Sequence, residues 1–184
     1  IARLLELRDP ETLVTGFDRQ NLYFEVAAPA DKQAALKNFL AQRRDKSGIV
    51  YCLTRRAVEE VCAALQDAGY AATRYHAGLP PEERQQNQDD FLYDRAAVMV
   101  ATNAFGMGID KSNVSFVVHY QMPKNMEGYY QEAGRAGRDG EPAECVLYYS
   151  GQDVRTNQFL IENAEPNPEL TEEEAEALKN RERE

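Results

Sequence analysis

The sequence predicts an α/β domain with a mainly parallel central sheet. Short apolar runs rich in valine, tyrosine and phenylalanine alternate along the middle of the chain with longer amphipathic segments. Such alternation indicates βαβ units, whose strands run parallel. The chain has 184 residues, of which 43% are hydrophobic, so one domain with a real core is expected. No apolar run approaches the roughly 20 residues of a membrane-spanning helix, so we expect no membrane partner.

Three local signals support the order of the elements. The first strand alternates apolar and polar residues, as a half-buried strand does. Thr54 directly follows a strand and is placed to cap a helix. Pro80 and Pro81, followed by two glutamates, form a good helix start. The expected strands are 21–26, 48–53, 72–77, 97–102, 115–121 and 144–150. The expected helices are 30–43, 54–68, 80–93, 125–137 and 151–163.

Both ends of the chain differ from its middle. Residues 1–20 are interpreted as an incoming helix and connector, 21–161 as the folded domain, and 162–184 as an acidic tail. The chain begins without methionine, and we expect it to be a fragment of a longer protein. In the tail, Thr171 and Glu174 have capping-box spacing. The segment is polar nearly all round, so both a solvated helix and disorder remain open.

The net charge of −10 argues against a nucleic-acid partner at first sight. The tail, however, holds nine acidic and three basic residues, so most of the negative charge lies there. A locally basic face on residues 1–161 therefore remains possible.

The three cysteines, Cys52, Cys62 and Cys145, are far apart and lie in apolar settings. No CxxC pair occurs, so we predict buried free thiols in a reducing compartment and no metal site. Together with the absence of a signal peptide, this favours a cytoplasmic location.

The stretch YYQEAGRAGRDG combines two arginines with three glycines within twelve residues, and it is the first candidate for a functional site. On a helix from 125 to 138, Gln131, Arg135 and Arg138 would share one face, at i, i+4 and i+7. Gly134 and Gly137 would remove bulk beside them and let the guanidiniums approach an anion. The alternative is a solvated basic face that ends in a glycine-rich cap.

A second candidate is the loop after the predicted strand 97–102. Ligands of α/β sheets bind at the carboxyl ends of parallel strands. Here Gly106 and Gly108 permit close approach of a phosphate or ribose, and Asp110 suits a ribose hydroxyl. The GMG sequence alone is a weak signal, because it lacks the third glycine and the helix of a dinucleotide fingerprint.

A third candidate is Thr54 with Arg55. A helix N-terminus after a strand favours an anion, and Arg55 would add charge. An ordinary cap with surface arginines is the alternative. His76 and His119 are more simply explained as structural histidines than as ligands.

The sequence also lacks the loop that would hold a triphosphate for these arginines to contact. It contains no GxxxxGK[ST] loop and no acidic box after an apolar strand to hold Mg²⁺. The simplest solution is a site in two parts, in which another lobe holds the triphosphate and Arg135 or Arg138 reaches across as an arginine finger.

In this order, TRRAVEE, YHAGL, VATNAFGMGIDKSNVSFVVH and YYQEAGRAGRDG resemble the second RecA-like lobe of RecQ-family DNA helicases, members of helicase superfamily 2. The resemblance covers about 9–161 and includes the connector LRDPETLVTGFDRQNLYFEV. RNA helicases of the superfamily usually have a His-Arg pair where this chain has Tyr130 and Gln131. The resemblance implies a RecA-like three-layer domain.

The resemblance also implies roles for individual residues. Gln131, Arg135 and Arg138 match the motif that reaches the γ-phosphate, with Arg138 as the preferred finger. Gly108 and Asp110 match a loop that meets the nucleotide. The DNA-backbone contacts would be Thr54, Arg55 and Thr102.

For the whole protein, the resemblance implies ATP-driven 3′ to 5′ DNA unwinding with Mg²⁺, in DNA repair or recombination. ATP and Mg²⁺ would be held mainly by an N-terminal RecA-like lobe of the same polypeptide, so this chain alone should not hydrolyse ATP. In RecQ proteins a zinc-binding segment usually follows this lobe, so zinc is possible in the full-length protein but is not expected in this chain. Two alternatives remain: a non-catalytic nucleic-acid or protein binding module with the same fold, and an RNA helicase lobe.

Overall fold

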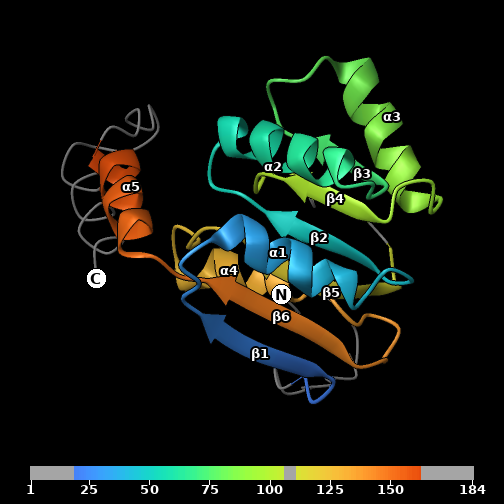
Figure 1. Ribbon diagram of the computed structural model, residues 1–184, viewed down its shortest axis with the longest axis horizontal. Helices are drawn as coiled ribbons and strands as arrows, with labels where there is room; N and C mark the ends of the chain where they lie inside the picture. Colours follow the sequence, from blue (N-terminus) through green and yellow to red (C-terminus); the bar gives the residue numbers. More distant parts are fainter. Residues whose placement is uncertain (1–18, 106–110, 163–184) are drawn as a thin grey trace, which may run out of the picture.

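The computed structural model describes residues 19–105 and 111–162. In this part of the chain, six parallel strands form one sheet in the order β1-β6-β5-β2-β4-β3 (Figure 1). The strands are β1 (Leu22–Ala27), β2 (Ser47–Tyr51), β3 (Ala72–Tyr75), β4 (Val98–Ala101), β5 (Val114–His119) and β6 (Ala143–Tyr148). The helices are α1 (Lys32–Ala41), α2 (Arg55–Asp67), α3 (Pro81–Leu92), α4 (Met126–Ala133) and α5 (Gly151–Glu162). The predicted α/β class with a parallel sheet is confirmed.

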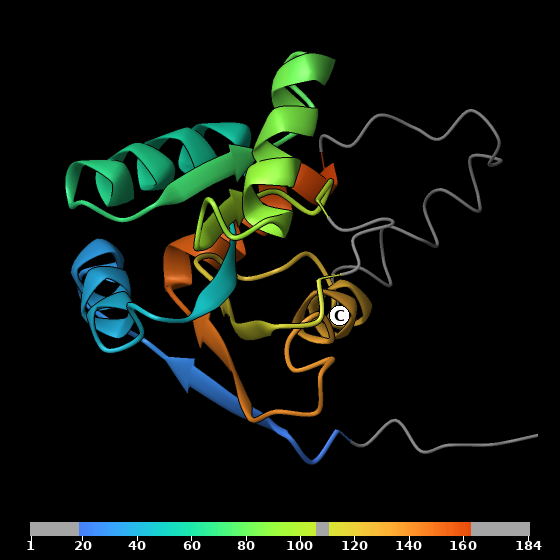
Figure 2. The same ribbon diagram turned by 90° about the vertical axis from the view of Figure 1, so that its right-hand side faces the viewer.

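Helices cover both faces of the sheet, which gives three layers. Helices α1 and α2 lie on one face, and α3 and α4 lie on the other (Figure 2). The central strand β2 shows the alternation that this requires, because Val50 packs toward α1 and α2 while Ile49 and Tyr51 pack toward α4. Gly48 lets the ring of Phe116 pack over its backbone, since a Cβ there would lie only 2.2 Å from the ring.

Local capping chemistry sets the helix starts. The Thr54 hydroxyl accepts a hydrogen bond from the Ala57 amide at 3.1 Å, so the predicted cap of α2 is confirmed. Helix α3 begins at Pro81 as expected. Asn125 caps α4 by accepting a hydrogen bond from Gly128 at 2.8 Å.

The end of α4 corrects a prediction. The helix stops at Ala133 and does not continue to 137 or 138. The amides of Arg135 and Ala136 bond to carbonyls three residues back, and Gly137 then takes a φ of +57°. That left-handed conformation favours glycine and ends the helical path. The expectation that Gln131, Arg135 and Arg138 share one helix face is therefore wrong.

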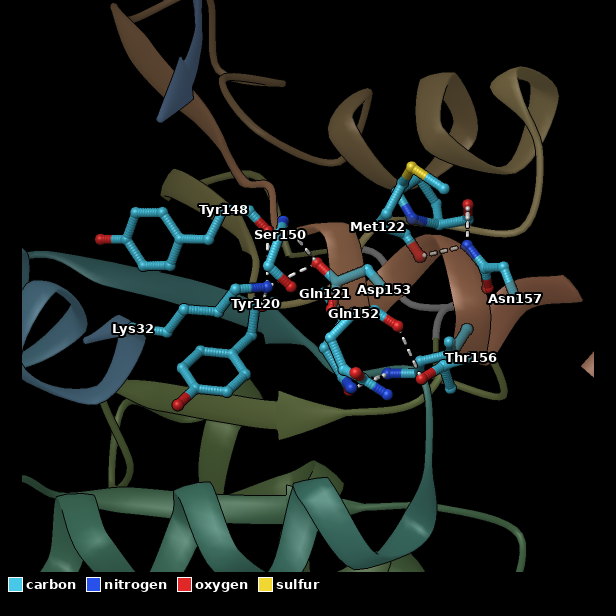
Figure 3. A network of polar contacts seen from close by, with 12 residues as sticks. Lys32, Tyr120, Gln121, Met122, Tyr148, Ser150, Gln152, Asp153, Thr156 and Asn157 are labelled. Atoms are coloured by element: carbon cyan, nitrogen blue, oxygen red, sulfur yellow. Dashed lines mark hydrogen bonds and ion pairs between the residues drawn. The ribbon is translucent and has the colours of Figure 1, made fainter. Parts of the chain in front are cut away.

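Lys32 of α1 fastens α5 to the carboxyl end of the sheet (Figure 3). Its Nζ donates to the carbonyls of Tyr120 and Tyr148, at 3.0 and 2.9 Å, and to the Asp153 carboxylate at 2.5 Å. One turn along α5, Asn157 donates to the carbonyl of Met122 at 3.0 Å. Through these bonds, α5 is tied to the loop between β5 and α4.

No helix within the described ranges is both long enough and apolar enough to cross a membrane. The three cysteines are buried and free, as predicted. The connector 1–18 and most of the tail, with its proposed cap at Thr171, lie outside the described residues.

Candidate functional site

The carboxyl ends of the central strands lie side by side. The register pairs Tyr51 with both Ala101 and His119, and it pairs Tyr75 with Ala101. The segments that follow these strands therefore meet at one edge of the sheet. A cavity of about 270 Å³ opens there against the first turns of α4. Its polar lining includes Asn103, His119, Gln121, Asn125, Gln131 and Glu132.

Thr54 and Arg55 stand at this edge, one and two residues after Leu53, which lines the cavity. The Thr54 hydroxyl accepts the capping bond described above, which leaves its proton available to donate. Arg55 is exposed, and its guanidinium lies against Gly78 of the next strand-to-helix loop. A cation beside a helix N-terminus suits a phosphate.

Thr102 is buried in a turn at the same edge. Its amide donates to the carbonyl of Tyr75 at 3.1 Å, and its carbonyl accepts from the Phe105 amide at 3.0 Å. The exposed residue of this turn is Asn103, which also lines the cavity. Gly108 and Asp110, and also Gly106, lie outside the described residues.

The predicted phosphate-sensing residues lie on the α4 side of the sheet but occupy different positions. Gln131 is on α4 and lines the cavity. Arg135 follows the helix, and its guanidinium lies beside the buried hydroxyl of Tyr51. Arg138 is exposed and follows the turn at Gly137, whose amide donates to the carbonyl of Val114 at the start of β5.

The pKa of the Tyr51 hydroxyl is affected by both arginines. Burial raises the pKa of its hydroxyl above the usual range, and the nearby charges of Arg135 and Arg138 oppose this rise. The Arg135 Nε is buried, and no residue in the described ranges accepts its hydrogen bond. A buried donor of this kind calls for an acceptor supplied by another group.

Both histidines have carboxylate partners, as structural histidines do. The Gly78 amide donates to Nδ1 of His76, so Nε2 carries the proton and donates to Glu59 at 2.7 Å. His119 is buried at the end of β5, and its Nε2 lies 2.8 Å from Glu132 of α4.

Sequence reasoning missed Tyr51 and the pair of His119 with Glu132. The signal for Tyr51 was its place at the end of a buried strand, three residues before the capping threonine. The pair of His119 with Glu132 was harder to predict, because the two residues belong to different elements, β5 and α4.

The described residues offer no metal site. No three His, Cys, Asp or Glu side chains in the ranges 19–105 and 111–162 are grouped as metal ligands would be.

The comparisons with known proteins agree with this geometry. A model of the helicase conserved C-terminal domain matches residues 31–140, which is more than half of the chain. The chain belongs to this helicase family. Within it, the chain is a RecQ-type C-terminal lobe, as its similarity to RecQ proteins shows. The resemblance given by the sequence motifs is confirmed.

Two relatives illustrate the similarity of this RecQ-type lobe. It is 47% identical over 165 residues to the ATP-dependent DNA helicase RecQ of Bacillus subtilis (strain 168), covering 90% of the chain and 28% of the relative. It is 43% identical over 180 residues to the protein of the same name from Pasteurella multocida (strain Pm70), covering 97% of the chain and 28% of the relative. The lobe thus spans less than a third of these relatives.

A solved structure supports the fold of the lobe. The RNA-helicase Prp28 from Chaetomium thermophilum, bound to ADP, matches with a TM-score of 0.63 and 24% identity. The match covers 78% of this chain and 36% of that one. This likeness confirms the RecA-like architecture of the RecQ-type lobe.

Proposed function

We propose that this chain is the second motor lobe of an ATP-dependent 3′ to 5′ DNA helicase of the RecQ type. The observation that carries the proposal is the position of Arg135. Its guanidinium lies near Tyr51, and its buried Nε finds no acceptor among the described residues. An ATP phosphate held by the N-terminal lobe of the same polypeptide would bind the part of this guanidinium that is not buried.

In this proposal, the phosphate contacts are shared. Arg138 is the arginine finger, since it lies on an exposed turn beyond α4, while Arg135 and Gln131 contact the nucleotide nearby. Such a finger stabilises the charge that develops on the transferred phosphoryl group. Gly108 and Asp110 are proposed to contact the nucleotide from the preceding loop.

Mg²⁺ would neutralise the charge on the phosphates when it is bound. We propose that its ligands belong mainly to the N-terminal lobe, and the described residues contain no group of three His, Cys, Asp or Glu side chains that could hold a metal. Alone, this lobe then has half a site and should not turn over ATP.

DNA is the proposed polymer partner. The protein is proposed to bind it at a single-stranded tail and at the junction with the duplex. Thr54, Arg55 and Thr102 are proposed to contact its phosphates, independently of base sequence. The two threonines follow adjacent strands, so their positions are compatible with one strand of backbone. A zinc segment in the whole protein, roles in repair or recombination, and the cytoplasmic location stay predictions from the sequence.

The test is ATP turnover of the complete protein with single-stranded DNA, single-stranded RNA and no polymer. We expect single-stranded DNA to stimulate ATP turnover by the complete protein strongly. We expect residues 1–184 alone to show no ATP turnover. Stronger stimulation by RNA would favour the RNA helicase alternative. If the complete protein bound DNA without turning over ATP, the non-catalytic binding module would replace the motor.

A further inference from the structure

The turn at residues 76–79 lies beside the proposed DNA contact Arg55, and the proposed function does not use it. This turn lies between β3 and α3, and it contains the exposed Gly78. A Cβ on Gly78 would lie 3.1 Å from Nη1 of Arg55 and 3.2 Å from its Cδ. Both separations are shorter than ordinary van der Waals contact. The Arg55 side chain therefore rests against the Gly78 backbone, in space that a larger residue would fill.

His76 shapes this turn with both its side chain and its backbone. Its Nδ1 accepts a hydrogen bond from the Gly78 amide at 3.2 Å, and its carbonyl accepts one from the Leu79 amide at 3.1 Å. Only 5% of His76 is exposed, so water would not readily replace the first bond if it were lost. The position of the Gly78 backbone therefore depends on the His76 ring.

The His76 ring is fixed in turn by α2, the helix that carries Arg55. Its Nε2 donates to Glu59 at 2.7 Å. Arg74 pairs with the other oxygen of this carboxylate, with its Nε 3.1 Å away, and its Nη2 contacts Glu83 of α3 at 2.9 Å. Arg55 and Glu59 are four residues apart on α2, so they share one face of the helix. The contacts thus run from Arg55 through the turn and return to α2 one helical turn later.

We propose that His76 is a positioning residue for Arg55, because it holds the backbone against which the Arg55 guanidinium rests. A free arginine side chain loses conformational entropy when it binds a phosphate. A side chain that the turn already confines has less entropy to lose, so its contact with a phosphate is stronger. This inference rests on the proposed function for the contact between Arg55 and DNA. The arrangement of the turn can be tested without DNA.

The test is a matched pair of substitutions at His76 in the complete protein. His76→Asn places an amide oxygen near the position of Nδ1, so it can accept from Gly78 but cannot reach Glu59. His76→Gln places its amide near the position of Nε2, so it can donate to Glu59 but offers no acceptor to Gly78. Hydrogen exchange of the 76–79 turn is measured without DNA. Affinity for single-stranded DNA is measured over a range of salt concentrations, for each variant alone and combined with Arg55→Ala.

Gly78→Ala tests the same contact from the other side. The added methyl group would take the space that Arg55 uses, and it would also crowd Nδ1 of His76 at 3.2 Å. Both effects disturb the placement of Arg55. Gly151→Ala is the matched control, because a Cβ at Gly151 would meet nothing within 4 Å.

We expect Arg55→Ala to weaken DNA binding by about tenfold and to lower the salt slope by about 0.7. His76→Gln and Gly78→Ala should each weaken binding by about threefold, with no further loss in the Arg55→Ala background. His76→Asn and Gly151→Ala should bind DNA like the wild type. Exchange in the 76–79 turn should be faster in His76→Gln and unchanged in His76→Asn.

Wild-type exchange in His76→Gln would overturn the positioning role. A loss of affinity that His76→Gln adds in full to the loss from Arg55→Ala would also overturn it, since a purely structural role acts independently of the arginine. If exchange changed as expected but Arg55→Ala bound DNA like the wild type, the proposed DNA contact would fail while the arrangement of the turn stood.

Discussion

Arg19 holds the turn that carries the proposed arginine finger, because its Nη2 donates to the carbonyl of Gly137 at 2.7 Å. The same nitrogen donates to Ala136 at 3.1 Å. Asn21 adds bonds from its amide to Gly137, at 2.8 Å, and to Glu141, at 2.9 Å. Residues that precede β1 thus fix the backbone immediately before Arg138.

Replacing Arg19 should loosen this turn. Arg19→Ala removes the two bonds from this charged donor to the turn, each worth about 1.5–3 kcal/mol, so we expect slower ATP turnover and a lower free energy of unfolding. Arg19→Lys retains the charge without the planar fork and should have an intermediate effect. Turnover of the complete protein and urea denaturation check this, and wild-type behaviour of Arg19→Ala would contradict it.

Gly137 is required for a reason different from the one that the sequence predicted. Its φ of +57° is strained for other residues, and a Cβ would meet Asn21 Nδ2 at 2.5 Å and the Glu141 carbonyl at 2.9 Å. Gly140 has a φ of +87° but open space around it. Conformational strain alone costs about 1–2 kcal/mol, so Gly137→Ala should destabilise the fold by more than Gly140→Ala. Equal losses in a denaturant titration would rule out the role of these contacts.

Lys32 and Asp153 form a largely buried ion pair, with side-chain exposures of 14% and 5%. Lys32→Met would leave the carboxylate and two carbonyls without their cation, so we expect a loss of about 3–5 kcal/mol in the free energy of unfolding. Arg56→Ala is the control, because its pair with Glu60 is exposed and should contribute little to stability. Similar losses for both variants would refute the buried-pair account.

The buried thiols predict how stability depends on alkaline pH. Burial raises the pKa of Cys62 to about 11 and that of Cys145 to about 12. An unfolded thiol ionises at a pH of about 8.5, so above that pH the unfolded chain loses protons that the folded chain keeps. Stability is therefore fully present below about pH 8.5 and falls as the pH rises toward 11. Cys62→Ala should flatten this decline in denaturation series from pH 8 to 11, whereas an unchanged slope would contradict it.

The fold, and the sheet edge at which the candidate site lies, followed from local patterns. The cap at Thr54 was predictable because a threonine after a buried strand and before an amphipathic helix has few other uses. The sheet edge that gathers Thr54 and Thr102 followed from the parallel topology. Periodicity could not show that α4 ends at Ala133, since the left-handed turn at Gly137 that follows is also bonded to Asn21, more than a hundred residues away in the chain. The links made by His76 and Lys32 are also long-range, so no local pattern contains them.

The measurement that tests the central claim most directly is DNA-stimulated ATP turnover by the complete protein, wild type against Arg138→Ala, with ATP binding measured in parallel. Arg44→Ala is a control, because Arg44 is an exposed arginine that lies over the Tyr70 ring, away from the proposed site. We predict that Arg138→Ala loses about 10³-fold or more in turnover and retains ATP binding, while Arg44→Ala remains active. Turnover by Arg138→Ala at the wild-type rate would contradict its role as the finger and move that role to Arg135.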